Sequence, residues 1–145
     1  MFEDNSLPDI TWDEIIFCLN HNVMNDEYLN INVFRWFGIV LHKTEMHNSI
    51  TDVLKEFSRL DDSKRAEAHI YISLTERSET FDWHVDDTEV IFWQAIGKTI
   101  FSVKEDNKIF EYELNKNSLV YLPRKIPHKT KPMTPRVGIS LGYLD

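Results

Sequence analysis

The sequence predicts a mainly β protein, an antiparallel sandwich or barrel whose helices are confined to the first half of the chain. From about Glu67 onward, short runs rich in β-branched and aromatic residues follow one another, separated by turn residues. These runs are 69–74, 81–86, 89–96, 98–103, 109–114, 118–122 and 136–143. Close-spaced strands with little helix between them are typical of antiparallel sandwiches and barrels.

Two helices are expected before residue 67. Thr11-Trp12-Asp13-Glu14 has the form of a capping box, which predicts a helix that starts there. A second helix is expected over 49–60, because apolar residues recur in it at helical spacing. They are Ile50, Val53, Leu54, Phe57 and Leu60. The stretch 33–41 between the helices predicts one strand. The simplest organisation of the 145 residues is one domain, in which 1–66 form a helical cover and 67–145 the barrel core.

Turn chemistry separates several of the expected strands. Glu105-Asp106-Asn107-Lys108 predicts a hairpin loop, and Gly97 predicts a sharper reversal between two strands. Both turns favour strands that run antiparallel to their neighbours in sequence.

Composition and charge exclude some classes of function. The net charge of −8 and the pI near 5.2 argue against general nucleic-acid binding, which needs a basic face. A local group of basic residues, Arg124, Lys125, Lys129 and Lys131, is best interpreted as a solvated loop. No apolar run is long enough to span a membrane, and the start is acidic and unlike a signal peptide. Because Cys18 is the only cysteine, no intramolecular disulfide is possible, and we expect a reducing cytoplasm.

His84 and Asp86 are the first candidate metal ligands. Residues i and i+2 of a strand point to the same face, so this imidazole and this carboxylate can converge on one ion. A second histidine from a neighbouring strand would complete the set of two histidines and one carboxylate that non-haem Fe(II) oxygenases use. A His-x-Asp triplet alone is weak evidence, because it also arises by chance.

The segment from Asn117 to His128 supplies the third candidate ligand. Asn117 adopts left-handed turns almost as readily as glycine does. Pro123 and Pro127 stiffen the loop that precedes His128, and a metal ligand needs such rigid placement. The three residues together predict a divalent metal site, with Fe(II) favoured.

The segment 117–128 resembles the second motif of the cupin superfamily, and the region around His84 and Gly97 resembles the first. Asn117 and Lys125 stand where cupins usually have glycine. Asp86 stands where many have a second histidine, and Val90 where they have a glutamate ligand. These departures resemble the JmjC-like branch, the 2-oxoglutarate oxygenases that use His-x-Asp and a distant His.

A closer likeness is to the bacterial-type ribosomal protein hydroxylases of that branch, carried by 90–101 and 139–143. The resemblance covers about residues 67–143. It implies a cupin-type double-stranded β-helix, a jelly-roll barrel with the N-terminal helices packed on it. It also implies Fe(II) held by His84, Asp86 and His128.

The same resemblance implies 2-oxoglutarate as co-substrate, oxidised to succinate and CO2 while a substrate is hydroxylated or demethylated. The relatives usually place a basic residue two positions after the turn glycine, where this chain has Thr99. Lys98 lies one position early and would face the other way. Arg136 is the better anchor for the distal carboxylate, because it shares a strand face with Ser140. Tyr71 could hydrogen-bond a co-substrate carboxylate.

Two other functions remain open on the sequence. One is a cupin metalloenzyme that uses no 2-oxoglutarate, which the departure at Thr99 favours, and the other is a non-catalytic metal-binding cupin module. For an oxygenase, we expect a small molecule or a short peptide segment as substrate, and the acidic charge favours a cationic one. A homodimer is compatible with the sequence.

Overall fold

The structure, a computed structural model, describes residues 7–24, 31–42, 48–61, 63–78 and 81–144. It contains two helices, α1 (Trp12–Met24) and α2 (Asn48–Ser58), and a short 3-10 turn (Arg35–Phe37). The strands are β1 (Ile31–Phe34), β2 (Gly38–Leu41), β3 (Arg65–Ser73), β4 (Val90–Ile96), β5 (Thr99–Glu105), β6 (Lys108–Leu114), β7 (Leu119–Leu122), β8 (His128–Pro132) and β9 (Arg136–Leu144).

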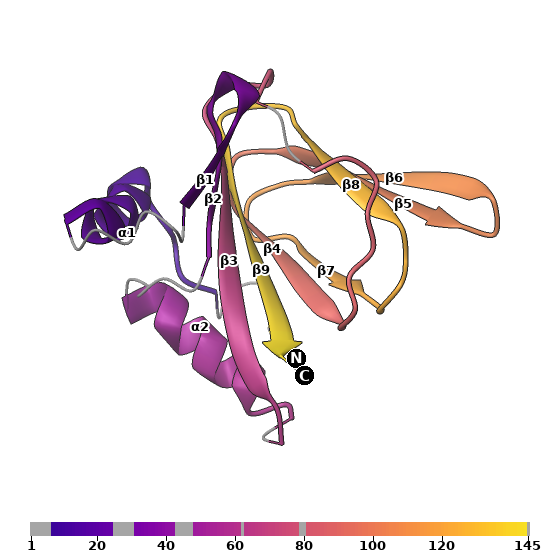
Figure 1. Cartoon of the computed structure of the whole chain (residues 1–145), viewed down its shortest axis with the longest axis horizontal. Coiled ribbons are helices and arrows are strands. Elements are labelled where there is room, and N and C mark those ends of the chain that lie inside the picture. Colours follow the sequence, from indigo (N-terminus) through magenta and orange to yellow (C-terminus); the bar gives the residue numbers. More distant parts are fainter. Residues whose placement is uncertain (1–6, 25–30, 43–47, 62, 79–80, 145) are drawn as a thin grey trace.

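The strands form two antiparallel sheets that face each other (Figure 1). The larger sheet has the order β1-β2-β3-β9-β4-β7, and the smaller has the order β6-β5-β8. Both helices lie on the far side of the larger sheet, away from the smaller one (Figure 1). The structure therefore confirms the predicted mainly β jelly-roll barrel with N-terminal helices packed on it.

Alternation along the strands divides the apolar residues between two cores. On β9, Ile139 and Leu141 face the helices and are fully buried with residues of α1 and α2. Phe92 of β4 and Phe101 of β5 belong to a smaller cluster inside the barrel. The inner faces of β3 and β9 carry polar residues instead, and they line the candidate site described below.

The N-terminal region departs from its expected form. The stretch 33–41 is not one strand, as predicted, but the hairpin of β1 and β2. Trp36 and Phe37 turn the chain with φ values of 59° and 56°, although aromatic residues rarely adopt this conformation. Residues before 67 thus add two strands to the edge of the larger sheet, besides covering it with helices.

Three other predicted local signals, one helix start and two turns, are confirmed. The Glu14 amide donates to the Thr11 hydroxyl oxygen over 3.3 Å, which is one half of the expected capping box. Asp106 and Asn107 turn the β5–β6 hairpin with φ values of 50° and 64°, and Gly97 lies between β4 and β5 with a φ of 76°. In the described ranges, neither helix has the length and apolar character needed to cross a bilayer.

Candidate metal centre

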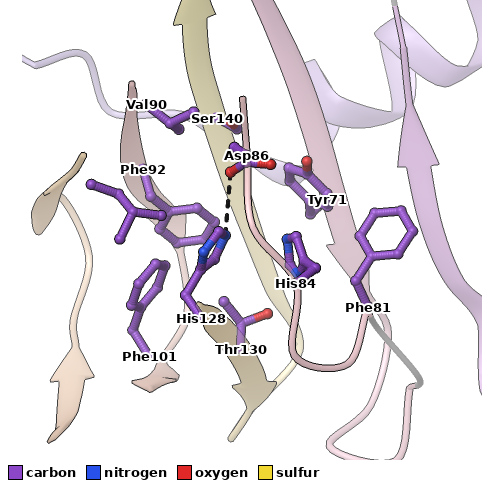
Figure 2. Close-up of a pocket in the computed structure, with 11 residues that line it drawn as sticks. Tyr71, Phe81, His84, Asp86, Val90, Phe92, Phe101, His128, Thr130 and Ser140 are labelled. Carbon is purple, nitrogen blue, oxygen red and sulfur yellow. Dashed lines mark ion pairs between the residues drawn. The ribbon is translucent and has the colours of Figure 1, made fainter. Parts of the chain in front are cut away.

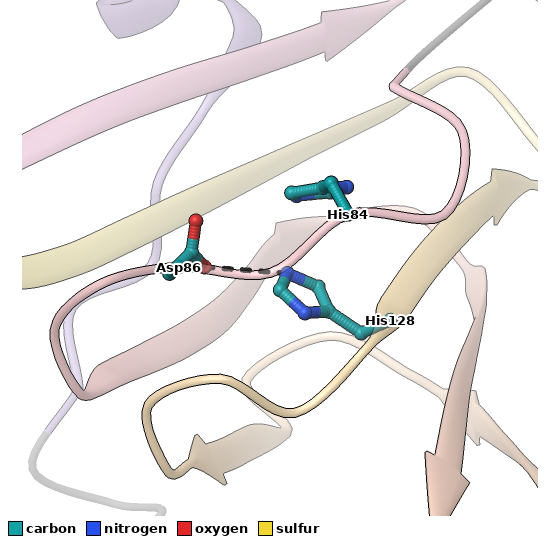
Figure 3. A group of neighbouring side chains, drawn as sticks. All are labelled: His84, Asp86 and His128. Atoms are coloured by element: carbon teal, nitrogen blue, oxygen red, sulfur yellow. Dashed lines mark ion pairs between the residues drawn. The ribbon is translucent and has the colours of Figure 1, made fainter.

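His84, Asp86 and His128 meet inside the barrel. One ligand atom from each lies within 4.8 Å of the others (Figure 3). His84 and His128 face each other across an isolated antiparallel bridge, with amide-to-carbonyl hydrogen bonds of 3.1 and 3.0 Å. The predicted strand over 81–86 is otherwise absent, so this bridge alone places His84 beside β8. The backbone, rather than the side chains, thus sets the spacing of the two imidazoles.

The two imidazoles are oriented by their Nδ1 atoms. Nδ1 of His84 lies 2.7 Å from the carbonyl oxygen of Asp82, and Nδ1 of His128 lies 2.9 Å from that of Ile126. A carbonyl only accepts, so each Nδ1 carries a proton, and Nε2 is the atom that can offer a lone pair to a metal, in place of any proton it shares with a neighbour. Metal-binding histidines commonly show this arrangement, which fixes the tautomer and the ring orientation.

Asp86 completes the set. Its Oδ2 lies 3.3 Å from Nε2 of His128 (Figure 3). The hydrogen bond from His128 holds the pKa of Asp86 below its usual value, against the opposing effect of burial. An ionised carboxylate and two imidazole lone pairs are the donors that Fe(II) and Mn(II) accept, so the residues fit such a metal.

The loop before His128 is tied to the segment that carries Asp86. Lys125 has a φ of 65°, and its amide donates to the carbonyl oxygen of Asp86 over 2.8 Å. Asn117 also has a φ of 65°, as its glycine-like position predicted. The Asn117 Oδ1 accepts a 3.0 Å hydrogen bond from the indole Nε1 of the fully buried Trp93. The Lys125 contact thus ties the loop before His128 to Asp86, and the Asn117 contact anchors the start of the segment 117–128.

A pocket opens beside the three ligands. Aromatic and aliphatic side chains form most of its wall, and Figure 2 shows them turned toward the two imidazoles. Besides the ligands it is lined by Tyr71, Phe81, Val90, Phe92, Phe101, Leu122, Thr130 and Ser140. The ring of Phe92 lies over Gly138, where an added Cβ would come within 2.3 Å of the ring. Glycine at this position therefore makes room for the aromatic wall.

Arg136 is a buried cation behind this pocket. Its side chain is 1% exposed, and its guanidinium donates to the hydroxyls of Ser73 (2.9 Å), Thr99 (3.3 Å) and Thr130 (3.3 Å). Burial lowers the pKa of Arg136 to about 10, so the group stays charged at neutral pH. Among the described residues, no carboxylate lies within ion-pair distance of it.

The other candidate co-substrate residues fall into two groups. Tyr71 and Ser140 line the pocket, and burial raises the pKa of Tyr71 to about 12, so its hydroxyl stays protonated. Thr99 is buried against Arg136 rather than at the pocket wall. The structure does not bring Lys98 to the site: its side chain is exposed, 4.0 Å from Glu113.

Sequence reasoning missed Thr130 and Ser73. Thr130 follows His128 by two positions on β8, so it shares the inner face and both lines the pocket and contacts Arg136. The spacing from His128 could have identified it. Ser73 gave no such signal, because only the pairing of Ser73 with Arg136 between β3 and β9 places it there.

A second hollow of about 230 Å³ adjoins the pocket and shares Tyr71, Asp86, Val90 and Ser140 with it. Its further lining includes the carboxylates of Glu67 and Asp87. His69 also lines the hollow, 3.7 Å from Glu67, and burial lowers its pKa, which favours the neutral ring. The approach to the metal centre is therefore acidic.

No protein-family model and no curated protein matches the sequence, so its likeness to known proteins lies in the structure. The structure is similar to that of YcfD, a ribosomal oxygenase from Escherichia coli, solved in complex with cobalt and 2-oxoglutarate. The TM-score is 0.65 at 17% sequence identity, and the match covers 79% of this chain and 34% of that chain. For YcfD with cobalt and succinic acid, the TM-score is 0.64 at 19% identity, over 74% of this chain and 31% of that chain.

A variant of oxalate decarboxylase from Bacillus subtilis is more distant, with a TM-score of 0.54 at 13% identity, over 79% of this chain and 27% of that chain. This chain thus spans about a third of the length of the YcfD chains or less. At such identities the likeness shows the fold, and these neighbours are cupin-fold enzymes. The chain has the cupin fold.

Proposed function

We propose that this protein is an Fe(II)- and 2-oxoglutarate-dependent dioxygenase that hydroxylates or demethylates its substrate. The observation that carries the proposal is the buried Arg136, which has no carboxylate partner among the described residues and lies behind a His-Asp-His metal centre. A buried charge is costly without a counter-ion, so a cation kept in this state indicates an anionic ligand.

The distance between the metal ligands and Arg136 matches the length of a short dicarboxylate. His128 and Thr130 are two residues apart on the inner face of β8, which is about 7 Å along a strand. Thr130 in turn contacts Nη2 of Arg136. A ligand that bound the metal at one end could therefore place its distal carboxylate at the guanidinium.

Arg136 retains hydrogen-bonding capacity for that carboxylate. A guanidinium has five N–H groups, and the hydroxyls of Ser73, Thr99 and Thr130 accept from Nε, Nη1 and Nη2. The second N–H on each of the two Nη atoms remains, which matches a carboxylate that binds through both oxygens. Thr99 supports this role, because a longer basic residue there would compete with Arg136 for the same space.

The residues around the metal would each have a definite part. Fe(II), when bound, supplies the chemistry that activates O2. His84, Asp86 and His128 would hold it on one side and leave the pocket side open. Phe81, Phe92 and Phe101 would exclude water. Tyr71 and Ser140 would position the co-substrate by hydrogen bonds.

We extend the proposal to the substrate, which reaches the metal through the acidic hollow. Glu67 and Asp87 line that hollow and would favour a cationic group on a small molecule or a short peptide segment. The cytoplasmic location expected from the single cysteine belongs to the same proposal, because reducing conditions keep iron as Fe(II).

The test is binding of 2-oxoglutarate to anaerobic, Fe(II)-loaded protein, followed in air by assay of succinate. We expect binding and slow formation of succinate without any added substrate. Arg136→Met should keep the metal and lose 2-oxoglutarate, whereas His84→Ala should lose both. Lys98→Met is the matched control, because Lys98 is exposed and outside the pocket, and it should behave as the parent does.

Failure of the loaded protein to bind or convert 2-oxoglutarate would contradict the proposal. A cupin metalloenzyme that needs no 2-oxoglutarate would then be favoured, since Thr99 departs from the usual basic residue and a decarboxylase shares the fold. Retention of metal by His84→Ala would instead contradict the ligand assignment itself.

A further inference from the structure

The outer face of the smaller sheet carries two opposite rows of charge. On β8, His128 and Thr130 point into the barrel. The alternate residues Lys129 and Lys131 therefore point away from it. On β6, Glu111 and Glu113 point outward by the same alternation, because Tyr112 pairs with the inward Phe101. The central strand β5 separates the basic row from the acidic row.

The two rows are in register with each other. Ser102 of β5 pairs with both Lys129 and Glu111. Ile100 pairs with both Lys131 and Glu113. Each lysine is therefore level with one glutamate on the far side of β5, at a separation of two strand spacings, about 9.6 Å.

Among the described residues, Glu111, Lys129 and Lys131 form no ion pair, whereas Glu113 lies 4.0 Å from Lys98. Both helices lie beyond the larger sheet, so they do not cover this face (Figure 1). Glu111, Glu113 and Lys131 are exposed.

We propose that this face is the interface of a homodimer in which the lysine row of each copy packs on the glutamate row of the other. Consider a two-fold axis that is parallel to β5 and lies midway between the two facing sheets. Rotation about it places β8 of one copy over β6 of the other and keeps each residue at the same height along the strand direction. It therefore places Lys129 of one copy over Glu111 of the second, and Lys131 over Glu113. The contact is the same in both directions, as a two-fold interface requires.

The remaining residues of the face fit this arrangement. Ile100 and Ser102 lie nearest the axis: Ile100 is partly exposed and can meet its own copy, while Ser102 is buried beneath its neighbours. The ammonium groups of Lys104 and Lys129 lie 5.7 and 5.0 Å from the centre of the Trp83 ring. In the dimer, Lys129 exchanges this contact for Glu111 of the second copy, whereas Lys104 keeps it. Facing sheets pack about 10 Å apart, a gap that a lysine and a glutamate side chain span together.

A second copy fits this face better than a polyanion does. Nucleic acid would gain from Trp83 and the lysines but would meet Glu111 and Glu113 on the same surface. The hollow that leads to the metal centre is lined from β3, β9 and the segment before β4, so dimerisation leaves it open in both copies. The proposal is independent of the metal and of 2-oxoglutarate.

The dimer should be weak and sensitive to salt. Three strands about 4.8 Å apart, with five to seven residues each at about 3.4 Å, give a footprint on the order of 300 Å² per copy. This is well below the roughly 800 Å² per partner of a standard stable interface. Charge pairs at an exposed rim are screened over about 8 Å at physiological ionic strength.

The test is sedimentation equilibrium of the full chain at about 20 mM and about 500 mM salt. We expect reversible dimerisation at low salt, weakened about tenfold or more at high salt. Two variants reverse one row each: Glu111→Lys with Glu113→Lys, and Lys129→Glu with Lys131→Glu. Each variant alone should be monomeric, because like charges then face each other. Mixed together they should associate, because both contacts between the two variants are again opposite in charge.

A matched control reverses two exposed charges elsewhere, Lys55→Glu with Glu76→Lys, and should dimerise as the parent does. Monomeric parent protein at low salt would overturn the proposal. So would dimerisation of either single-row variant alone, or failure of the mixed variants to associate. Association of the parent only when RNA is added would also overturn it and assign the lysine row to a polyanion.

Discussion

At the scale of single residues, Arg136 is the most informative group in the protein. Most buried arginines pair with a carboxylate, whereas this one is held by three neutral hydroxyls. Those hydroxyls orient the guanidinium without neutralising it. The side chain is thus kept at a cost to folding, and the cost is what a bound anion would offset.

Replacement of Arg136 by Met should therefore not destabilise the ligand-free protein. Loss of a structural buried arginine from an ion pair costs about 3–5 kcal/mol. Here the free energy of unfolding should stay unchanged or rise, by up to about 2 kcal/mol, because an unpaired buried charge is removed. Urea denaturation of the metal-free protein measures this. A loss of more than about 2 kcal/mol would identify Arg136 as a structural residue.

The sequence predicted much of the site at this scale, for identifiable reasons. The spacing of His84 and Asp86 and the rigid approach to His128 are local features, and the structure brings these three together. The distinction between Lys98 and Arg136 depended on which side of a turn each side chain faces. Ser73 could not be predicted, because its role follows from a pairing between strands 63 residues apart.

At the scale of elements, two non-glycine residues in the left-handed region shape the metal-binding loop for different reasons. Asn117 provides a hydrogen bond to a buried indole through its side chain. Lys125 uses only its backbone amide at the site, while its ammonium forms an exposed ion pair with Asp87. The hydrogen bond to Trp93 therefore compensates the left-handed backbone at Asn117. At Lys125 the side chain offers only an exposed ion pair, which contributes little.

Glycine substitutions at the two positions should have opposite effects. Asn117→Gly should destabilise the fold by about 1 kcal/mol or more, because the indole N–H of Trp93 loses its acceptor. Lys125→Gly should stabilise it by up to about 1 kcal/mol, because relief of backbone strain exceeds the loss of an exposed ion pair. Thermal unfolding of both variants measures this.

Lys125→Ala is the control for that comparison. Alanine also removes the ion pair but keeps the strained backbone, so this variant should be less stable than Lys125→Gly. Equal stability of the two variants would show that strain at residue 125 is negligible.

Elements were predictable where local chemistry and tertiary context agree. The capping box of α1 and the Asp106-Asn107 turn are examples. The β1–β2 hairpin was missed because Trp36 and Phe37 occupy turn positions that glycine or asparagine normally fills. The segment before β4 alternates like a strand, yet in the described residues it forms one isolated bridge, at His84, and one further backbone hydrogen bond, between Lys125 and Asp86.

At the scale of the whole molecule, the candidate metal centre lies between segments that are distant along the chain. His84 and Asp86 precede β4 of the larger sheet, and His128 begins β8 of the smaller one. A bound ion would therefore cross-link two parts of the barrel. Because the unfolded chain offers no such site, the ion stabilises only the folded state.

Metal binding should raise the melting temperature in proportion to the logarithm of metal concentration. At about 100 times the dissociation constant, the added stability should be about 2.7 kcal/mol. Differential scanning calorimetry with Fe(II) under anaerobic conditions, or with Mn(II), measures this. Asp86→Ala should remove most of the shift, and an unchanged shift in that variant would place the metal elsewhere.

The bridge between His84 and His128 also links a bound ion to hydrogen exchange of the backbone. Two backbone hydrogen bonds join the histidines, and in the described residues no regular strand pairing extends the bridge on the His84 side. An ion held by both imidazoles would hold the two segments together and oppose opening of the bridge. Hydrogen exchange of these two amides should therefore slow when the ion binds, to a degree that depends on metal concentration.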